Sequence, residues 1–411
     1  MEILRLHLGL MIKINIVILG NIMLVPNTYS HNIKDPSASS SKQLHLFDPP
    51  LIRPYPPHLM AKEIFQAGTV KSSNTKIILF WNLFYNQTDT TFGFGKSPFV
   101  KAGCKTSNCF ATNDRHLFNQ SDGIIIHAGN YEESDLPKHR FPHQRFIFFS
   151  QDSLSDGFQQ SCFSTPHFWN WTMSYRRDSD IYLSMPFAWS LRRRNNDLSA
   201  IVNDFSQKKC LQSAKKTKLI AWFNSDCSTQ SKREEYVKKL GEYIPVDIYG
   251  KCGTLVNCSS RNDPRCDERV LLEQYKFYIA AENSLCPDYI TGEFYRALIN
   301  NVIPIVYGGA DYTQYAPSNS YINIADFKSP KDLSEYLLLL SSNEALYSKY
   351  FQWKKEYELN WKPPTAGWFD LCEKLNDPTE KKKSYENLSK WWHDDVPCFK
   401  GYSFLSLIQS E

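Results

Sequence analysis

The chain has 411 residues, of which 42% are hydrophobic and 14% aromatic, so it can bury a large core and is long enough for two domains. Its formal net charge is only +4 and no Arg/Lys-rich face is evident, which argues against a nucleic-acid partner. The 11 cysteines cluster in loops without a CxxC pair, which favours disulfides in an oxidising compartment over zinc and leaves at least one thiol unpaired within the chain.

The N-terminal residues have the pattern of a membrane-targeting segment. Arg5 and Lys13 precede an apolar segment that ends at Val25, and about 20 mostly apolar residues suffice to span a bilayer. We therefore expect a cytoplasmic tail over residues 1–7 and a signal-anchor transmembrane segment over 8–25, with the body on the luminal side. A cleaved signal peptide is the alternative, because polar residues interrupt the apolar run. Residues 26–70, rich in Ser and Pro, are expected to form a stem.

The next part of the chain has the pattern of an α/β domain. Apolar runs at Lys76 to Trp81, Asp122 to His127 and Arg145 to Phe149 predict strands, and they alternate with turns rich in Gly, Asn and Asp. We assign residues 71–205 to this first domain. The polar segment from Leu191 to Ser213 is expected to connect it to the second.

A second α/β domain is predicted over residues 206–360. Leu219 to Phe223 and Val246 to Tyr249 are expected strands, and Ser231 to Gly241 an intervening helix that opens with a capping box of Ser231 and Glu234. Ser329 is expected to cap another helix, with proline at its first position. The tryptophan-rich residues 361–411 are expected to pack back on the body.

One βαβ unit stands out within the second domain. The apolar run Phe277 to Ala281 predicts a buried parallel strand that ends in the polar turn Glu282-Asn283-Ser284. Asp288 is expected to cap a helix from about Ile290 to Ile299, and Val302 to Val306 returns as a strand. Ligands bind such units at the carboxyl ends of the strands, where helix N-termini attract anions. Many βαβ units bind nothing, so the pattern alone leaves both interpretations open.

The individual residues of this stretch are more informative than its pattern of strands and helix. The motif FY-x-A-x-ENS-x-C-x-DYIT, followed by RAL and VIPIVYG, resembles the α-1,3-fucosyltransferase family, glycosyltransferase family 10. NWTMSYRRDSD, SKREEYVKKL and YINIADFKSPKDLSEYL support the resemblance, which is strong from about Phe141 to Tyr357. It implies the GT-B architecture, with two Rossmann-like domains facing a central cleft, the first for the acceptor and the second for GDP-fucose.

The resemblance also implies a function. It is the inverting transfer of L-fucose from GDP-fucose in α-1,3 linkage to GlcNAc, on a glycan of glycoproteins or glycolipids. The protein is expected in the Golgi membrane as a single-pass type II protein. No cofactor is expected to be required, with a divalent metal at most stimulating the reaction.

The resemblance assigns roles to seven positions. Asp152 matches the catalytic base, and Arg233, in the first turn of its helix, matches the arginine that binds the diphosphate. The donor-binding positions are Arg233, Tyr249, Glu282, Asn283, Tyr289 and Glu293. Tyr249 and Tyr289 are also plausible as core aromatic residues with a wetted hydroxyl.

The chain departs from the family pattern at three places. Gly292-Glu293 replaces Glu-Lys, so a carboxylate takes the position of a cation that contacts the diphosphate. Asp152 replaces a glutamate, and Asn224-Ser225-Asp226 stands where Val-Ser-Asn is usual. Two alternatives stay open: a catalytically impaired, fucosyltransferase-like Golgi protein, and a related enzyme that uses another nucleotide sugar. Lys276 and Arg296 are the cations that could compensate for Glu293.

Two further motifs bear on the surface and on metals. Asp178-Ser179-Asp180 resembles a metal-binding DxD, but in this family the stretch belongs to the body, so no metal site is expected and Arg176 and Arg177 are candidate partners for these carboxylates. Five sequons agree with a luminal body. Their asparagines are Asn86, Asn119, Asn170, Asn257 and Asn387.

Overall fold

The computed structural model describes residues 74–88, 92–101, 104–153, 163–183, 189–193, 216–253, 272–361 and 366–399. The predicted tail, signal anchor and stem, and with them the question of a membrane span at residues 8–25, lie outside these ranges. Within the described ranges, no helix combines the length and the apolar character needed to cross a bilayer.

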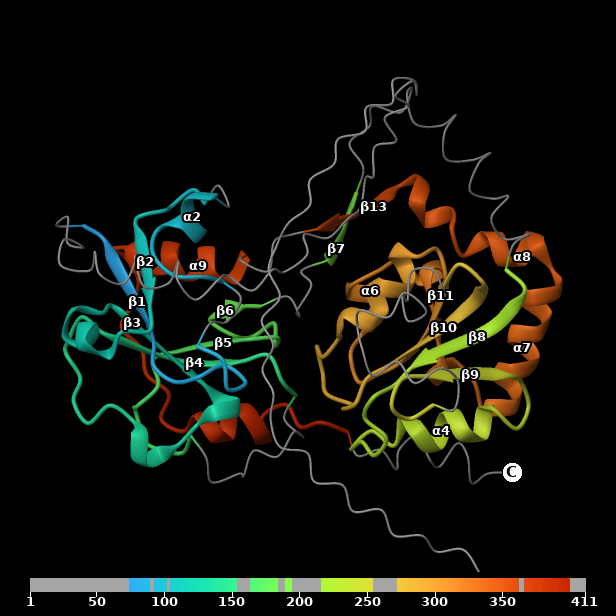
Figure 1. The fold of residues 1–411 in the computed structure, drawn as a ribbon, viewed down its shortest axis with the longest axis horizontal. Helices are drawn as coiled ribbons and strands as arrows, with labels where there is room; N and C mark the ends of the chain where they lie inside the picture. Colours follow the sequence, from blue (N-terminus) through green and yellow to red (C-terminus); the bar gives the residue numbers. More distant parts are fainter. Residues whose placement is uncertain are drawn as a thin grey trace, which may run out of the picture. The chain divides into compact units, whose positions relative to one another are not determined.

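The first domain is built on a six-stranded, wholly parallel sheet with the order β2-β1-β3-β4-β5-β6 (Figure 1). Its strands are β1 (Lys76–Phe80), β2 (Cys109–Thr112), β3 (Gly123–His127), β4 (Arg145–Ser150), β5 (Trp171–Ser174) and β6 (Ile181–Tyr182). The three strands expected from apolar runs, β1, β3 and β4, are confirmed. They are buried along almost their whole length, as parallel strands covered on both faces must be.

Segments from the far end of the chain complete the core of this domain. Helix α9 (Ala366–Asn376) places Trp368 and Leu371 in the same apolar cluster as residues of β1 and β4, together with Phe99 of α2 (Ser97–Lys101). On the other face, Trp392 of the π-helical turn η11 (Lys390–Asp394) packs with Phe148 of β4. The C-terminal segment therefore belongs structurally to the first domain, although the second domain lies between them in the sequence.

The second domain has a five-stranded parallel sheet with the order β12-β11-β10-β8-β9. Its strands are β8 (Lys218–Phe223), β9 (Val246–Tyr249), β10 (Tyr275–Ala281), β11 (Ile303–Tyr307) and β12 (Ile322–Asn323). Helices α4 (Arg233–Leu240) and α7 (Pro330–Ser342) pack with one apolar cluster and α6 (Gly292–Ile299) with the other, so helices cover both faces (Figure 1). The predicted α/β class, with a parallel Rossmann-like sheet in each domain as in the GT-B fold, is confirmed.

Shorter elements complete the described chain. Strands β7 (Trp189–Arg193) and β13 (Tyr357–Trp361) form a separate antiparallel pair. The remaining helices are α8 (Glu344–Lys349), η2 (Arg115–Gln120), η3 (Ala128–Asn130), η4 (Glu133–Asp135), η7 (Tyr312–Gln314), η8 (Ser318–Ser320), η9 (Ile324–Asp326) and η10 (Gln352–Lys355).

One predicted helix start is confirmed and two need correction. The side chain of Ser329 accepts from the Asp332 N–H at 3.1 Å, with proline at the first helical position, as expected. Helix α6 is capped by Thr291 rather than Asp288, whose φ of +62° keeps it outside the helix. The capping box expected from Ser231 and Glu234 is absent: Lys232, which has no side-chain acceptor, is the N-cap residue of α4, and Glu234 Oε1 accepts instead from the Thr229 N–H at 3.0 Å.

The predicted disulfides are present among the described cysteines. Cys109 pairs with Cys372, Cys227 with Cys252, and Cys286 with Cys398, while Cys104 is a free thiol. The first bridge ties α9 to β2 and the second ties the loops that follow β8 and β9. The first bridge therefore joins a helix to a strand, and the second joins two loops.

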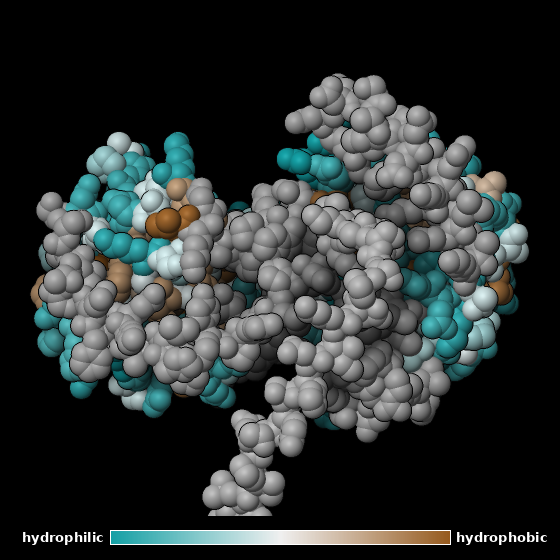
Figure 2. Space-filling view, turned by 45° about the horizontal axis from the view of Figure 1, so that its top comes forward, coloured by the Kyte–Doolittle hydropathy of each residue, from teal (hydrophilic) through white to brown (hydrophobic). Residues whose placement is uncertain are grey.

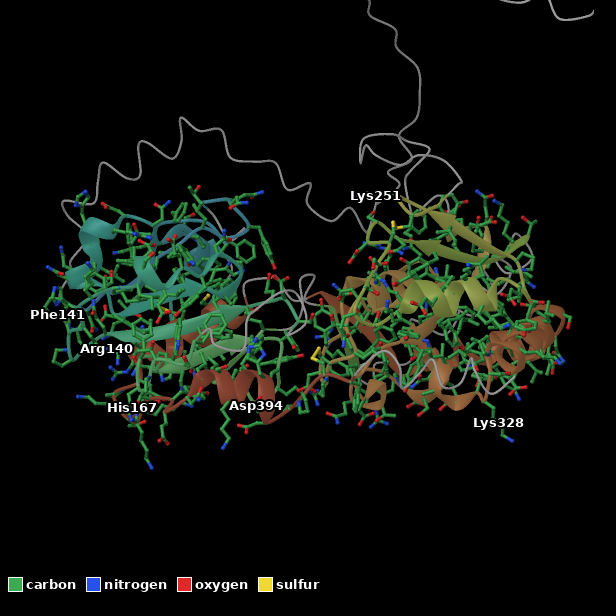
Figure 3. All side chains as sticks on the ribbon, turned by 90° about the horizontal axis from the view of Figure 1, so that it is seen from below. Arg140, Phe141, His167, Lys251, Lys328 and Asp394 are labelled. Atoms are coloured by element: carbon green, nitrogen blue, oxygen red, sulfur yellow. A yellow bond between two sulfur atoms is a disulfide. The ribbon has the colours of Figure 1, made fainter. Side chains whose placement is uncertain are left out.

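Where Figure 2 shows described side chains on the visible face, they are mostly teal, with smaller brown areas. Charged residues such as Lys328 and Asp394 are exposed and point away from the body, while the space around both sheets is densely filled by side chains (Figure 3).

Candidate active site

The carboxyl-terminal ends of β8, β10 and β11 bring polar residues together in the second domain. Asn224 follows β8, Glu282 and Asn283 follow β10, and Gly308 follows β11. Because these strands are parallel neighbours, their ends meet at one edge of the sheet, where α/β domains bind ligands. The polar turn after Ala281 thus lies at the predicted position of the site.

Arg233 turns inward toward this edge. It is the first residue of α4, and its Nη1 donates to the carbonyl oxygen of Ala281 while its Nη2 donates to Asn224 Oδ1 at 3.0 Å. Its Nε is buried and has no hydrogen-bond partner among the described residues. The guanidinium is thus held against the sheet edge with part of its hydrogen-bonding capacity unused.

Glu282 is a buried carboxyl group at the same edge, only 1% exposed. Its Oε1 accepts from the Thr291 N–H at 2.8 Å, which anchors it beside the start of α6. Burial raises the pKa of Glu282 to about 7, with the Glu293 carboxylate adding to the rise and Arg233 opposing it. The residue is therefore close to half protonated at neutral pH.

Buried polar atoms without partners cluster around these two residues. Folded proteins pair nearly all such atoms, so a group of them at one sheet edge is typical of a ligand site. Of the twelve buried side-chain atoms without a hydrogen-bond partner among the described residues, five lie here: Asn224 Nδ2, Arg233 Nε, Glu282 Oε2, Asn283 Oδ1 and Tyr312 Oη. A cation, an amide donor and acceptor oxygens together suit a polar, anionic ligand.

Gly308 makes room for this arrangement. A Cβ at this position would meet the hydroxyl of Tyr312 and lie 3.2 Å from Glu282 Cγ. Any larger residue would therefore push against two side chains of the cluster. The glycine after β11, expected only as a strand-breaking turn, lets Glu282 and Tyr312 approach the same place.

Glu293 is paired with a neighbouring cation. Arg296, one turn further along α6, places Nη1 2.8 Å from Glu293 Oε1, and the Tyr278 hydroxyl donates to Glu293 Oε2. Of the two compensating cations considered from the sequence, Arg296 is therefore the one beside Glu293. Lys276 instead donates to the carbonyl oxygen of Ser341. The carboxylate is neutralised locally, but its partner is thereby occupied.

Tyr249 and Tyr289 are buried aromatic residues. Tyr249 is 3% exposed, stacks on Phe223 and has its hydroxyl 2.6 Å from that of Tyr275, so its polar end is held by other side chains. Tyr289 is 4% exposed and packs edge-on against Tyr175. Both side chains are thus packed among other aromatic rings, and their role in donor binding stays a prediction.

Asp152 lies in the loop after β4, and this loop contacts the second domain. Its carboxylate accepts from the Tyr85 hydroxyl. The next residue, Ser153, is fully buried and donates to the hydroxyl of Ser284 at 2.7 Å. Since Ser284 directly follows Asn283, this bond brings the candidate base into the neighbourhood of the polar cluster.

His127, at the end of β3, stands next to the candidate base. It is 2% exposed, with Nδ1 3.3 Å from Asn130 Oδ1 and Nε2 buried without a partner in the described chain. Burial lowers its pKa, against the opposing effect of Asp152, so its neutral form is favoured. A neutral imidazole can donate or accept a hydrogen bond and can also accept a proton.

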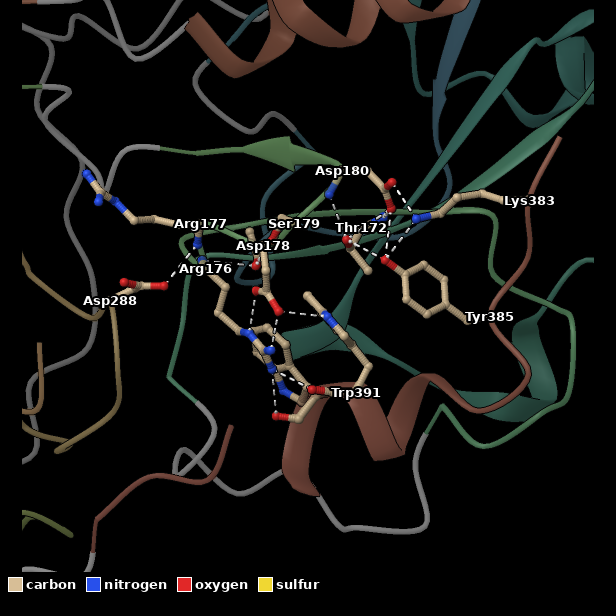
Figure 4. Close-up of polar contacts among 12 residues, drawn as sticks. Thr172, Arg176, Arg177, Asp178, Ser179, Asp180, Asp288, Lys383, Tyr385 and Trp391 are labelled. Atoms are coloured by element: carbon tan, nitrogen blue, oxygen red, sulfur yellow. Dashed lines mark hydrogen bonds and ion pairs between the residues drawn. The ribbon is translucent and has the colours of Figure 1, made fainter. Parts of the chain in front are cut away.

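The Asp178-Ser179-Asp180 motif serves the architecture (Figure 4). Asp178 binds Arg176, itself 2% exposed, at 2.6 Å and accepts from Trp391 Nε1 at 3.0 Å. Asp180 pairs with Lys383 at 2.5 Å. These bonds hold the C-terminal segment on the first domain, and no group of three or more His, Cys, Asp or Glu side chains among the described residues is placed to hold a metal ion.

The sequons differ in their accessibility. Asn86, Asn119 and Asn387 are exposed, whereas Asn257 lies outside the described residues. Asn170 is 8% exposed, its Nδ2 donating to Lys383 O at 2.9 Å and its Oδ1 accepting from the Phe146 N–H. The folded chain therefore leaves no room for a glycan on Asn170.

The raised pKa of Glu282 makes stability depend on pH. Between its ordinary value of 4.5 and about 7, the folded chain holds a proton that the unfolded chain has lost. The free energy of unfolding should therefore fall as pH rises through this window, by at most about 3 kcal/mol from this group. Glu282→Gln should remove that component, as measured by urea unfolding from pH 4.5 to 8. Identical pH profiles for the two proteins would contradict this assignment.

Several residues of the site were not predicted as such. Asn224 was noted only as a departure from a pattern, and Tyr312, Thr291 and Tyr85 were not singled out. Helical spacing could have paired Glu293 with Arg296, since residues three apart share a face. The sequence carries no comparable signal for Tyr312, because its approach depends on where the chain turns after β11.

Fold and site together define a class. Two parallel α/β sheets, one with a buried cationic and polar cluster at its carboxyl edge, are typical of proteins that bind nucleotide-like anions. Comparison with known families agrees. The family described as "Glycosyltransferase family 10 (fucosyltransferase) C-term" matches residues 213–391, and "Fucosyltransferase, N-terminal" matches residues 73–186.

Comparison with individual proteins gives a more specific assignment than the family models do. Alpha-(1,3)-fucosyltransferase C of Drosophila melanogaster is 34% identical over 340 residues, covering 78% of each chain. Glycoprotein 3-alpha-L-fucosyltransferase A of the same organism is 34% identical over 74% of this chain and 58% of its own length. Human 4-galactosyl-N-acetylglucosaminide 3-alpha-L-fucosyltransferase FUT6 is 33% identical over 70% of this chain and 76% of its own.

A crystal structure of an alpha1,3-fucosyltransferase with GDP-fucose is also similar, with a TM-score of 0.45 and 15% identity over 83% of this chain and 91% of the other. The sequence comparisons decide the assignment: the chain belongs to the glycosyltransferase family 10 fucosyltransferases. The predicted family and enzyme class are thereby confirmed.

Proposed function

We propose that the protein transfers L-fucose from GDP-fucose, with inversion and in α-1,3 linkage, to GlcNAc of glycoprotein glycans. The relatives named above support the reaction, since their names describe α-1,3-fucosyl transfer. The observation that carries the proposal is the inward guanidinium of Arg233 among buried polar atoms without partners. Such a site suits the diphosphate of a nucleotide sugar.

The second domain supplies the donor side of the chemistry. The leaving group is GDP, on which negative charge grows as the glycosidic bond breaks. Arg233, which is half-buried, can stabilise this charge with charge-assisted hydrogen bonds. Glu282, when protonated, adds a hydroxyl donor instead of a repelling carboxylate. Donor binding is therefore expected to be stronger below the pKa of Glu282 than above it.

The first domain supplies the base. We propose that Asp152 removes the proton of the acceptor hydroxyl as the hydroxyl oxygen attacks the anomeric carbon from the face opposite GDP. A single displacement of this kind inverts the configuration and needs no covalent intermediate. The Tyr85 hydroxyl holds the carboxylate of Asp152, whose arm is one methylene shorter than that of the glutamate it replaces.

The alternative is a fucosyltransferase-like protein with impaired catalysis, and Glu293 is the observation that favours it. A carboxylate in the first turn of α6 satisfies the helix dipole and repels a diphosphate, and its partner Arg296 is already engaged. If Glu293 causes the impairment, its negative charge limits the affinity for the diphosphate of the donor. The remaining alternative, another nucleotide sugar, would show as turnover with a donor other than GDP-fucose.

Replacing Glu293 by lysine separates these possibilities. Glu293→Lys should strengthen GDP binding about tenfold or more, because it exchanges a repelling charge for a charged hydrogen-bond donor and releases Arg296. Calorimetric titration of GDP into both proteins measures the change. The exposed Glu335→Lys, on α7, makes the same charge change and should leave the affinity within about twofold. An unchanged affinity for Glu293→Lys would show that this residue does not face the diphosphate.

We also propose a cellular setting and a cofactor requirement. The apolar segment at residues 8–25 would anchor the protein in the Golgi membrane as a single-pass type II protein with a luminal body. The exposed sequons and the disulfides support a luminal body. No metal is proposed as a requirement, because Arg233 can carry the charge stabilisation. Glycoprotein glycans are the proposed acceptor, with glycolipids as a second class.

The direct test is a transfer assay with the full-length chain. GDP-fucose labelled in the sugar is incubated with glycans ending in GlcNAc or lactosamine and with an N-glycan core, and the linkage of the product is determined by NMR. The proposal predicts fucose in α-1,3 linkage to GlcNAc. Product with another nucleotide sugar only would overturn the donor assignment, and GDP binding without any product would favour the impaired alternative.

A further inference from the structure

Asn224 occupies a rigid position at the mouth of the candidate site. Its N–H donates to Tyr249 O at 2.9 Å and its carbonyl oxygen accepts from the Cys252 N–H at 3.1 Å. The Cys227–Cys252 disulfide joins the same two loops. A Cβ at Gly250 would lie 2.7 Å from Asn224 O, so the loops pack too closely for a larger residue there. The backbone of Asn224 is therefore fixed from both sides.

The hydrogen bonds of the side chain fix its orientation. Asn224 Oδ1 accepts from Arg233 Nη2 at 3.0 Å and from the Asp226 N–H at 3.2 Å. Both partners are donors, so the oxygen and not the nitrogen must face them. Nδ2 consequently points away from Arg233 Nη2, and it is buried with no partner among the described residues in a side chain only 3% exposed.

The unpaired Asn224 Nδ2 is a hydrogen-bond donor that a ligand acceptor atom would satisfy. An amide NH₂ can only donate, and leaving it buried and unpaired costs free energy. It lies on the same side chain that holds the guanidinium, next to a cation with an unpaired Nε. A ligand that satisfies both groups must offer acceptor oxygens and negative charge, and a phosphoryl group does so.

We propose that Asn224 is a phosphate-binding residue of this protein: it positions the Arg233 guanidinium through Oδ1 and donates through Nδ2 to a phosphoryl oxygen of the nucleotide. The inference rests on the proposed function and names a residue beyond it. The second diphosphate contact therefore comes from the end of β8, on the side of the site away from Glu293 and the start of α6.

Two variants of the full-length chain test the role of Asn224, each titrated with GDP and with guanosine, which has no phosphate. Asn224→Asp keeps an acceptor for Arg233 and Asp226 but puts a second oxygen in place of the donor. Asn224→Val removes the amide altogether. We expect GDP affinity to fall at least about tenfold in both variants, and further in Asn224→Asp, while guanosine affinity stays within about twofold.

The guanosine titration separates a phosphate contact from a structural effect, because a distorted loop would weaken both ligands alike. Equal losses for GDP and guanosine in both variants, or no loss for either, would overturn the role of Asn224. If the wild-type chain binds GDP and the variants bind it equally well, this inference fails and the proposed function stands. A wild-type chain that binds no GDP overturns the proposed function, and this inference with it.

Discussion

Replacing Arg233 by alanine is expected to weaken GDP binding by about 100- to 1,000-fold. The variant loses a charged donor with at least two hydrogen bonds to the diphosphate, each worth about 1.5–3 kcal/mol, and every 1.4 kcal/mol is tenfold in affinity. Calorimetric titration of the full-length chain measures this loss. Arg233→Lys keeps the charge but not the planar guanidinium, so its GDP affinity should lie between those of the wild type and Arg233→Ala.

Arg233→Ala should also lower the free energy of unfolding, because Ala281 O and Asn224 Oδ1 lose their donor. Thermal unfolding of each variant separates this effect from binding. Lys238→Ala is the matched control, since Lys238 is an exposed cation on the same helix and lies in its last turn. Equal GDP affinities for Arg233→Ala and Lys238→Ala would remove Arg233 from the site.

Replacing Asp152 by asparagine is expected to slow fucose transfer by about 10²- to 10⁴-fold, the usual contribution of a general base. Asparagine has nearly the same shape and can still accept from the Tyr85 hydroxyl, but it cannot take a proton. The affinity for GDP should stay within about twofold, since the diphosphate is held in the second domain. Turnover and GDP titration on the same preparation measure both quantities.

Asp114→Asn provides the control for this prediction. Asp114 lies in the same domain, and its side chain accepts from the His116 N–H at 3.0 Å, a cap that asparagine provides equally well. Its substitution should leave turnover unchanged. If Asp152→Asn turns over as fast as the wild type, another group must be the base, and His127, with its buried Nε2, is the next candidate.

The long apolar runs made most of the fold predictable. Strands β1, β3, β4, β8, β10 and β11 each carry four or more consecutive residues typical of buried parallel strands, whereas β9, predicted over the same residues, is interrupted by Asp247. Strands β2, β5 and β6, with four, four and two residues, were not predicted from the sequence. Their pairing is fixed by neighbours and, for β2, by the disulfide to Cys372, which no local pattern indicates.

Helix starts show where local rules failed. Ser329 caps α7 as its spacing predicts, because all its partners lie within one turn. Asp288 had a similar local signal, yet its side chain accepts instead from the Arg177 N–H at 3.1 Å, a residue 111 positions away. The Asp288 carboxylate therefore binds a residue distant in sequence instead of capping the helix, as the local pattern predicted.

The candidate site was predictable to the extent that motifs and strand ends determine it. Arg233, Glu282 and Asn283 lie together as the βαβ pattern and the family resemblance suggest. Asn224 joins them only because β8 pairs with β10, a register set by the whole sheet. The pairing of Glu293 with Arg296 follows from their spacing on one helix, whereas the bond of Lys276 to Ser341 O joins residues far apart in sequence and is visible only in the structure.

A crystal structure of the full-length protein with GDP tests the central claim most directly. The account predicts phosphoryl oxygens within hydrogen-bond distance of the Arg233 guanidinium and of Asn224 Nδ2, with the Glu293 carboxylate still on Arg296. GDP bound elsewhere, or bound with Arg233 turned out to solvent, would contradict it.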